Sequence, residues 1–122
     1  MNRSRALVLL VDDEPVLLRV IGRVLAEGGY DVVTAATRAD AIALVRGEKP
    51  DVVVSDVALG HDSGLDLVLD VHDIDRLLPV ILLSGHGTDA NVGAFKQLNK
   101  PVGAATLWSA VREALSSRDQ EN

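Results

Sequence analysis

Apolar residues along this chain follow two alternating patterns. Five short segments are rich in apolar residues, and most are nearly continuous, as in strands buried on both faces; they cover residues 6–11, 30–35, 51–55, 79–83 and 94–98. Between them, apolar residues recur at the three- and four-residue spacing of helices, over about 15–27, 38–47, 65–75 and 104–115. This alternation of strand and helix predicts an α/β fold, a parallel sheet with helices on both faces.

Local signals mark the ends of the first two helices. Pro15 follows three acidic residues, and proline is favoured in the first helical turn, where acids also suit the helix dipole. Gly28 and Gly29 follow the last periodic residue, as is common where helices end. Thr37 with Asp40 resembles a capping box at the start of the second helix.

The stretch before the fifth strand is short. Ser84 to Thr88 has the composition of a loop, and only residues 89–92 remain before Gly93. We therefore expect a fourth helix between the last two strands to be short or missing. The chain as a whole, residues 1–122, is expected to be a single domain with its core in about 6–115. Residues 116–122 are expected to be a polar tail, which would also suit the start of a linker to a further domain.

Composition narrows the function. The chain is 48% hydrophobic but only 2% aromatic, and its net charge is −6. Few aromatic rings for base stacking and little positive charge argue against direct nucleic acid binding. The chain has no cysteine for disulfides or thiolate chemistry. No apolar run approaches the ~20 residues of a membrane span, so we expect a cytoplasmic domain without membrane contact.

Polar side chains follow the predicted strands at the points where they end. Asp12 and Asp13 follow the first strand, Asp56 the third and Ser84 the fourth, while Lys100 lies just beyond the fifth. In open parallel sheets, ligands bind beyond the carboxyl ends of the strands. These five side chains should therefore meet at one edge, although Asp12 and Asp13 could also simply cap the first helix.

Four sequence motifs in this order carry a family resemblance. Leu9-Leu10-Val11-Asp12-Asp13-Glu14-Pro15, Ser55-Asp56, Ser84-Gly85 and Lys100-Pro101 together resemble the receiver domain of two-component response regulators. The resemblance covers about residues 6–115. It implies a flavodoxin-like, doubly wound sheet of five parallel strands in the order 2-1-3-4-5.

By this resemblance, Asp56 is the phosphoacceptor. Asp12 and Asp13 would hold Mg²⁺ together with Asp56 and the backbone carbonyl of Ala58. The residue chemistry agrees, because a carboxylate can attack phosphorus to give an acyl phosphate. Three clustered carboxylates also need a cation, and Mg²⁺ prefers oxygen ligands.

The resemblance assigns roles to two further polar residues. Lys100 would pair with an oxygen of the phosphoryl group, and its bond to Pro101 is typically cis in the family. Ser84 would contact the phosphoryl group after transfer. Phosphorylation would then act as a local electrostatic event that a two-state element transmits.

The resemblance also implies partners. A histidine kinase or a histidine phosphotransfer protein would supply the phosphoryl group, and Pro15, Leu18 and Val102 are candidate contacts with it. Trp108 lies beside the apolar stripe of the last helix; it is either a rim residue that packs on the protein or an aromatic anchor for a partner. A homodimer and an output domain in a longer chain are further expected partners.

The sequence departs from the family pattern at three places. Ser84 and Lys100 are only 16 positions apart, which shortens the fourth helix. Gln97 stands where receivers usually carry the Tyr or Phe that turns inward on phosphorylation. Gly60 replaces a common proline four residues after the acceptor, which predicts a looser loop.

The leading function is therefore a phosphoacceptor domain without small-molecule turnover. The alternative is an atypical receiver that binds a partner without switching, which Gln97 and the short segment would favour. An aspartate-nucleophile phosphatase is a third class. It is disfavoured because such enzymes generally carry a second aspartate two residues after the nucleophile, where this chain has Ala58.

Overall fold

Five parallel strands form the central sheet of the protein, which a computed structural model describes over residues 5–85 and 94–120. They pair in the order β2-β1-β3-β6-β7, with every pairing parallel. Because β4 and β5 form a separate hairpin, β6 and β7 are the fourth and fifth strands of this sheet, and the expected order 2-1-3-4-5 is confirmed. The strands are β1 (Leu7–Val11), β2 (Asp31–Ala35), β3 (Val52–Asp56), β6 (Val80–Ser84) and β7 (Lys96–Asn99).

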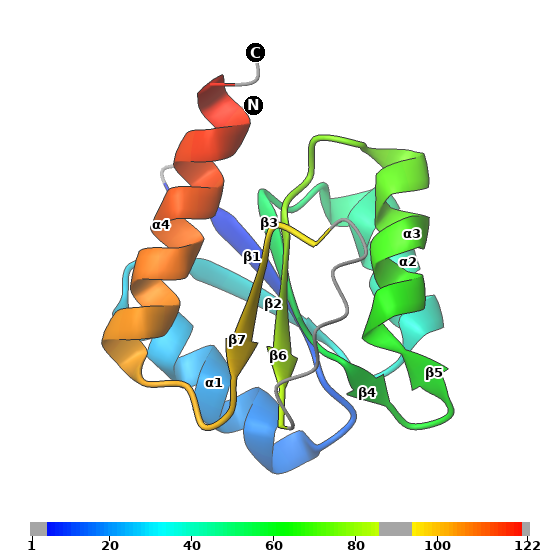
Figure 1. Ribbon diagram of the computed structural model, residues 1–122, viewed down its shortest axis with the longest axis horizontal. Coiled ribbons are helices and arrows are strands. Elements are labelled where there is room, and N and C mark those ends of the chain that lie inside the picture. Colours follow the sequence, from blue (N-terminus) through cyan, green and yellow to red (C-terminus); the bar gives the residue numbers. More distant parts are fainter. Residues whose placement is uncertain (1–4, 86–93, 121–122) are drawn as a thin grey trace.

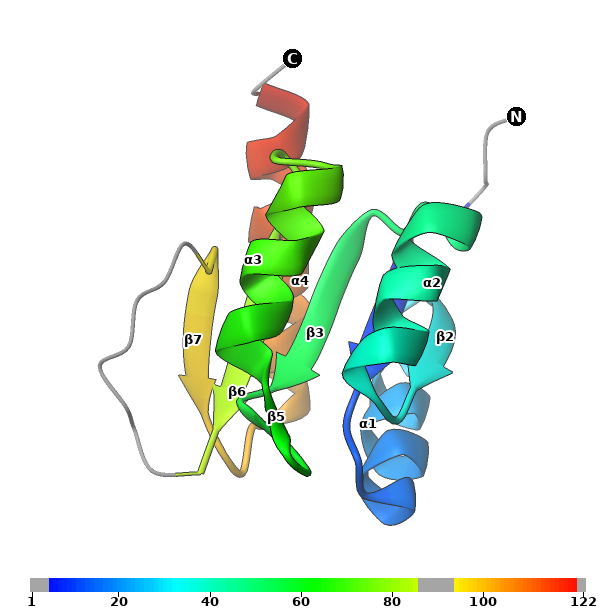
Figure 2. The ribbon, with the colours of Figure 1, turned by 90° about the vertical axis from the view of Figure 1, so that its right-hand side faces the viewer.

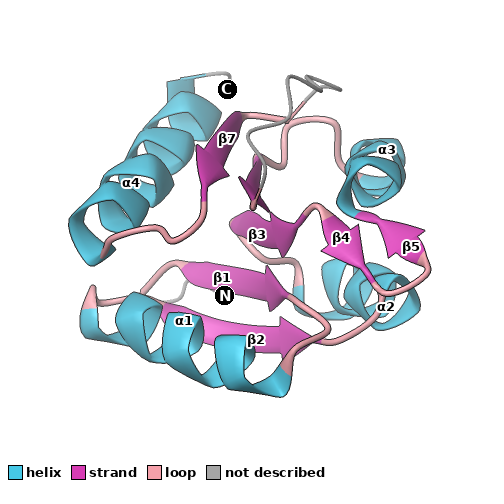
Figure 3. Cartoon of the chain, turned by 60° about the horizontal axis from the view of Figure 1, so that its bottom comes forward, coloured by secondary structure: helices cyan, strands magenta, loops and turns pink. Residues whose placement is uncertain are grey.

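Helices cover both faces of this sheet (Figure 1). They are α1 (Pro15–Glu27), α2 (Arg38–Glu48), α3 (Gly64–Ile74) and α4 (Ala104–Gln120). α1 and α4 lie on one face, and α2 and α3 lie side by side on the other (Figures 2 and 3). The prediction of helices on both faces is confirmed.

The apolar strands are explained by two cores, one on each face. Along β1, Val8 and Leu10 pack in the core beneath α1 and α4, while Leu9 and Val11 pack in the core beneath α2 and α3. Successive side chains of a strand point to opposite faces, so a strand covered on both sides must be apolar at every position.

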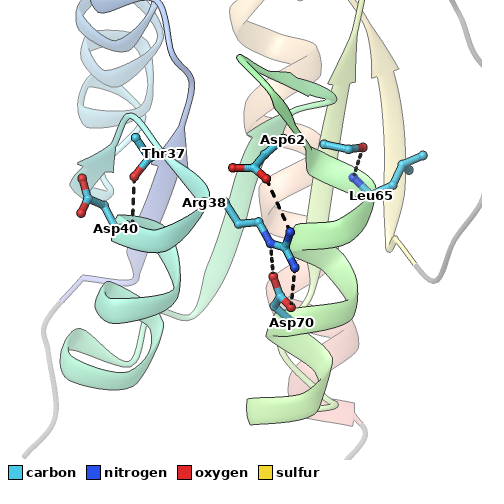
Figure 4. Close-up of polar contacts among 7 residues, drawn as sticks. Thr37, Arg38, Asp40, Asp62, Leu65 and Asp70 are labelled. Atoms are coloured by element: carbon cyan, nitrogen blue, oxygen red, sulfur yellow. Dashed lines mark hydrogen bonds and ion pairs between the residues drawn. The ribbon is translucent and has the colours of Figure 1, made fainter.

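Side-chain caps fix where two helices begin. The Thr37 hydroxyl accepts a hydrogen bond from the Asp40 amide (3.1 Å), as the capping pattern predicts, and the Ser63 hydroxyl accepts one from the Leu65 amide (3.0 Å; Figure 4). Such bonds satisfy amides that lack a partner in the first helical turn. α2 includes Gly47 and ends at Glu48, after which Lys49 takes a left-handed conformation (φ 51°).

A small hairpin follows the third sheet strand, where the sequence predicts a polar loop. β4 (Ala58–Leu59) pairs antiparallel with β5 (Asp62–Ser63). Gly60 turns the chain between them with a φ of 63°. Proline is confined to a φ near −65°, so the proline that the resemblance leads us to expect at this position could not form this turn. The segment is a paired hairpin rather than the looser loop expected.

The C-terminal helix is longer than its apolar pattern predicts. α4 continues to Gln120, through most of the predicted polar tail. Arg118 in this extension pairs with Asp75 at the end of α3 (2.7 Å), so a charged contact holds the last turns where apolar contacts end.

The expected short or missing fourth helix falls on residues 86–93, outside the described residues. Within the described parts of the chain, no helix combines the length and apolar character needed to cross a membrane.

Candidate acceptor site

The carboxyl ends of four strands place the predicted polar residues along one edge of the sheet. Asp56 ends β3 and Ser84 ends β6, while Asp12 directly follows β1 and Lys100 directly follows β7. Backbone bonds continue the strand pairing to this edge, from the Asp12 amide to the Ala35 carbonyl (3.1 Å) and from the Lys100 amide to the Ser84 carbonyl (2.8 Å). The backbone therefore fixes where these side chains start.

Three carboxylates and one ammonium meet at this edge. Oxygens of Asp12, Asp13 and Asp56 all lie within 4.8 Å of one another. The Lys100 ammonium is 3.1 Å from Asp56 Oδ2 and 3.6 Å from Asp12 Oδ2. The sequence prediction that these four residues would come together is correct in geometry.

The Asp12 carboxylate carries the electrostatic cost of this arrangement. Its side chain is only 1% exposed. Its Oδ1 accepts a hydrogen bond from the Glu14 amide (2.9 Å), but among the described residues Oδ2 has no hydrogen-bond partner. Burial raises the pKa of Asp12 most, and the charges of Asp56 and Asp13 add to the rise; the Glu14 amide and Lys100 act in the opposite sense.

Lys100 is held as a cation by the same cluster. Burial disfavours its charged form, but the hydrogen bond to Asp56 and the charges of Asp56 and Asp12 together raise its pKa. One ammonium leaves the three carboxylates with an excess of negative charge. A buried oxygen that has no hydrogen-bond partner among the described residues and lies beside two further carboxylates suits a hard cation such as Mg²⁺.

The remaining predicted site residues lie nearby. Ser84 is buried at the end of β6, the strand next to β3. Ala58 begins the hairpin, and its amide donates to Asp56 Oδ1 (3.4 Å); its carbonyl as a metal ligand stays a prediction. The Lys100–Pro101 bond is cis, as the resemblance implies.

The residues predicted to meet a phosphodonor lie along α1 and the β7–α4 loop. A hollow of about 380 Å³ between them is lined by Leu17, Val20, Ile21, Lys100, Pro101 and Val102. Val102 thus lines this hollow, whereas Leu18 packs partly buried against the core and Pro15 is exposed at the start of α1. Val16 and Val20 are more than half exposed one turn apart on α1, which leaves an apolar surface beside the site.

Trp108 of α4 joins this helix to α1, on the face of the sheet that both helices cover (Figure 3). Its indole N–H donates to the carbonyl of Val24 in α1 (2.7 Å). The ring lies against Gly28, where any Cβ would come within 3.0 Å of it. Within this chain Trp108 is therefore a half-buried packing residue; its contact with a partner stays a prediction.

Two sets of residues around the site escaped the sequence analysis. Gly64 begins α3 so close to the acceptor strand that its amide donates to the Val57 carbonyl (2.6 Å). Arg38 begins α2 and pairs with Asp70 of α3 and Asp62 of the hairpin. One signal was available, since a cation in the first turn of a helix opposes the helix dipole and suggests a partner elsewhere.

Fold and site together define a doubly wound α/β domain, with an acidic cluster and a lysine at the carboxyl edge of its sheet. The family of response regulator receiver domains matches residues 8–112 of the chain. The chain belongs to this family, and is thus a receiver domain of the two-component response regulators.

The chain is shorter than its curated relatives. The transcriptional regulatory protein GlrR of Escherichia coli (strain K12) is 36% identical over 121 residues, which cover 94% of this chain and 27% of that protein. The transcriptional regulatory protein KdpE of Mycobacterium tuberculosis (strain ATCC 25618 / H37Rv) is 36% identical over 126 residues, covering 94% of this chain and 55% of that protein. The chain thus spans about a quarter to about half of these relatives.

Solved receiver structures share the fold over nearly their whole length. The receiver domain protein from Clostridium thermocellum superimposes with a TM-score of 0.91 at 30% identity, covering 96% of this chain and 99% of that chain. The flavodoxin-like, five-stranded receiver fold expected from the sequence is thereby confirmed.

Proposed function

We propose that this chain is a phosphoacceptor domain that takes a phosphoryl group from a phosphohistidine donor onto Asp56. The observation that carries the proposal is the charged cluster at the sheet edge, in which Asp56 lies 3.1 Å from the Lys100 ammonium and within 4.8 Å of two further carboxylates. Asp12, Asp13, Asp56 and the Ala58 carbonyl would hold Mg²⁺, which would neutralise charge between the acceptor and the incoming phosphoryl oxygens.

The chemistry asked of the protein is modest. A carboxylate oxygen of Asp56 forms a bond to phosphorus while the phosphorus–nitrogen bond of the donor breaks, and its electron pair stays on the imidazole. The product is an acyl phosphate on Asp56. Lys100 supports the transfer with a fixed positive charge, and the Ser84 hydroxyl donates to a phosphoryl oxygen of the product. Because the acceptor is the protein itself, we expect no turnover of small molecules.

The donor would dock beside Lys100. The hollow between α1 and the β7–α4 loop is lined mostly by apolar side chains and has Lys100 in its wall. A histidine kinase or histidine phosphotransfer protein seated there would present its phosphohistidine to Asp56. Since the chain spans only part of its curated relatives, we also propose that it controls an output domain in a longer protein.

A second candidate function is a partner-binding receiver that does not switch. The observation that favours it is Gln97, a partly buried residue of β7 paired in register with Leu82 of β6. An amide side chain gains less than an aromatic ring from moving into an apolar interior. In this candidate, partner binding would not depend on phosphoacceptor chemistry at Asp56.

A phosphoryl analogue separates the two candidates. We expect beryllofluoride with Mg²⁺ to shift the amide NMR signals of Asp56, Ala58 and Ser84, because the analogue places charge where a phosphoryl group would lie. The same additions to the Asp56→Asn protein serve as the control, since the acceptor oxygen is then absent. If the wild-type spectrum stays unchanged at these residues, the phosphoacceptor proposal is wrong.

Acid should weaken Mg²⁺ binding at a higher pH than for an ordinary aspartate. Burial in the folded protein raises the pKa of Asp12 above its ordinary value of 3.8. Without a cation, this carboxyl group therefore stabilises the fold more as pH falls through the raised pKa, and less as pH rises. Mg²⁺ needs the ionised carboxylate, and its affinity should therefore fall as pH drops through the same pKa. Calorimetric Mg²⁺ titrations at several pH values measure this. Asp12→Asn should bind Mg²⁺ weakly and lack that step.

A further inference from the structure

The β4–β5 hairpin forms one wall of the acidic site. Its first residue, Ala58, donates its amide to the Asp56 carboxylate (3.4 Å). At its turn, a Cβ on Gly60 would lie 3.7 Å from Asp13 Oδ2. The hairpin thus contacts the Asp56 carboxylate and runs close to that of Asp13. Its position also decides where the Ala58 carbonyl lies relative to the cation that the proposed function requires.

This hairpin is too small to hold itself in place. It contains two residue pairs, Ala58 with Ser63 and Leu59 with Asp62. Isolated two-stranded hairpins are marginally stable at best in water. Leu59 anchors its first strand in the core beneath α2 and α3, and the second strand runs directly into α3. The exposed end of the second strand, at Asp62 beside the turn, can be held by a further attachment.

Arg38 provides that attachment. Its guanidinium contacts Asp70 of α3 through two nitrogens, at 2.5 and 3.1 Å, and lies 3.5 Å from Asp62 of β5 (Figure 4). Arginine is suited to this because its planar fork binds a carboxylate in a fixed orientation. The bond to Asp70 fixes where the guanidinium lies, and the guanidinium then fixes Asp62.

Local preference does not explain an arginine at this position. Arg38 is the first residue of α2, where the helix dipole favours anions. Its acidic partners offset this unfavourable position. The hydrogen bonds that Arg38 donates to Asp70, with the charges of Asp70, Asp66 and Asp62, raise the pKa of the guanidinium and keep it charged.

We propose that Arg38 is a positioning residue of the cation site: through Asp62 it holds the β4–β5 hairpin, and with it the Ala58 carbonyl, in place beside Asp56 and Asp13. The inference rests on the proposed function, since it concerns the Mg²⁺ site of the acceptor. A role confined to joining α2 and α3 would stabilise the fold without affecting the cation.

The direction in which Arg38→Gln changes the Mg²⁺ affinity distinguishes positioning from a general charge effect. Arg38→Gln removes a positive charge near a cation site, so the charge effect alone would tighten Mg²⁺ binding. If Arg38 positions the hairpin, binding should instead weaken by about tenfold, as is common when groups that orient metal ligands are lost. Calorimetric Mg²⁺ titration gives the affinity, and thermal unfolding without Mg²⁺ gives stability separately.

Asp62 and Asp66 supply a matched pair that leaves the Arg38–Asp70 contact intact. Both are exposed aspartates whose charges act on Arg38. Of these two, within the described residues, only Asp62 lies within ion-pair distance of Arg38, at 3.5 Å. Asp62→Asn should weaken Mg²⁺ binding several-fold more than Asp66→Asn, with shifted amide signals at Ala58.

Equal losses in the two asparagine variants, or unchanged or tighter binding in Arg38→Gln, would overturn this inference while leaving the proposed function standing. Wild-type protein that binds no Mg²⁺ would instead overturn the proposed function, and the inference with it.

Discussion

Asp56→Asn should abolish phosphoryl labelling of the protein by acetyl phosphate. An amide oxygen is a far weaker nucleophile than a carboxylate and cannot give a stable acyl phosphate. The fold should survive, because asparagine has nearly the same shape and keeps an oxygen to accept the Ala58 amide (3.4 Å). Intact-protein mass spectrometry in the presence of Mg²⁺ measures the label, and circular dichroism measures the fold.

The matched control for this prediction is Asp31→Asn. Asp31 is an exposed aspartate at the start of β2, at the opposite edge of the sheet from the acceptor. Its loss changes the net charge of the chain by the same amount, so labelling should stay at the wild-type level. Full labelling of Asp56→Asn would place the acceptor elsewhere and refute the proposed mechanism.

Gly64→Ala should destabilise the protein by about 1–3 kcal/mol, the usual cost of overfilling a packed site. A Cβ at this position would lie under 3.0 Å from the Asp56 carbonyl oxygen and 3.1 Å from the Val57 Cα. Both contacts are with backbone, which cannot rotate away as a flexible side chain can. Either the start of α3 or the end of β3 must move, and labelling of Asp56 should slow as well.

Gly47→Ala is the counterpart in α2. No atom lies within 4 Å of a Cβ built on Gly47, which sits inside the helix. Replacing a helical glycine with alanine stabilises by roughly 0.5–1 kcal/mol. Urea unfolding followed by circular dichroism compares the two variants. If Gly64→Ala proves as stable as Gly47→Ala, the close approach of α3 to the acceptor strand is wrong.

The residues at the sheet edge were predictable because two simple rules combine there. Asp12 and Asp56 lie at the ends of apolar strands and Lys100 directly follows β7, and parallel topology brings the carboxyl ends of the strands to one edge. The alternation of apolar segments sufficed for both rules. Sequence distance does not matter in this argument, since it uses only the local position of each residue on its strand.

The contacts that support the site were not predictable in the same way. Arg38 and Asp70 are 32 positions apart, and Trp108 and Val24 are 84 apart. Each pair depends on how neighbouring helices pack, and no local pattern specifies that. The helical period placed Trp108 correctly beside the apolar stripe, but it could not identify the carbonyl that accepts its N–H.

The turn at Gly60 shows a further limit of local reasoning. The missing proline suggested a looser segment, because only the loss of a rigid residue is visible in the sequence. The structure shows a glycine in a conformation that proline cannot take, inside a paired hairpin. Glycine in place of proline would loosen a loop that proline stiffens, but the turn at Gly60 requires glycine-like freedom at this position.

The attachment of Trp108 also determines what light emission from this protein can report. The chain has a single tryptophan, and its indole is fastened to the end of α1 by the Val24 carbonyl and Gly28. Its fluorescence therefore reports on the contact between α1 and α4, and should change most when the domain unfolds. Constant Trp108 fluorescence during phosphoryl transfer would show that the contact between α1 and α4 stays intact. The chemistry at Asp56 would then be followed by other probes.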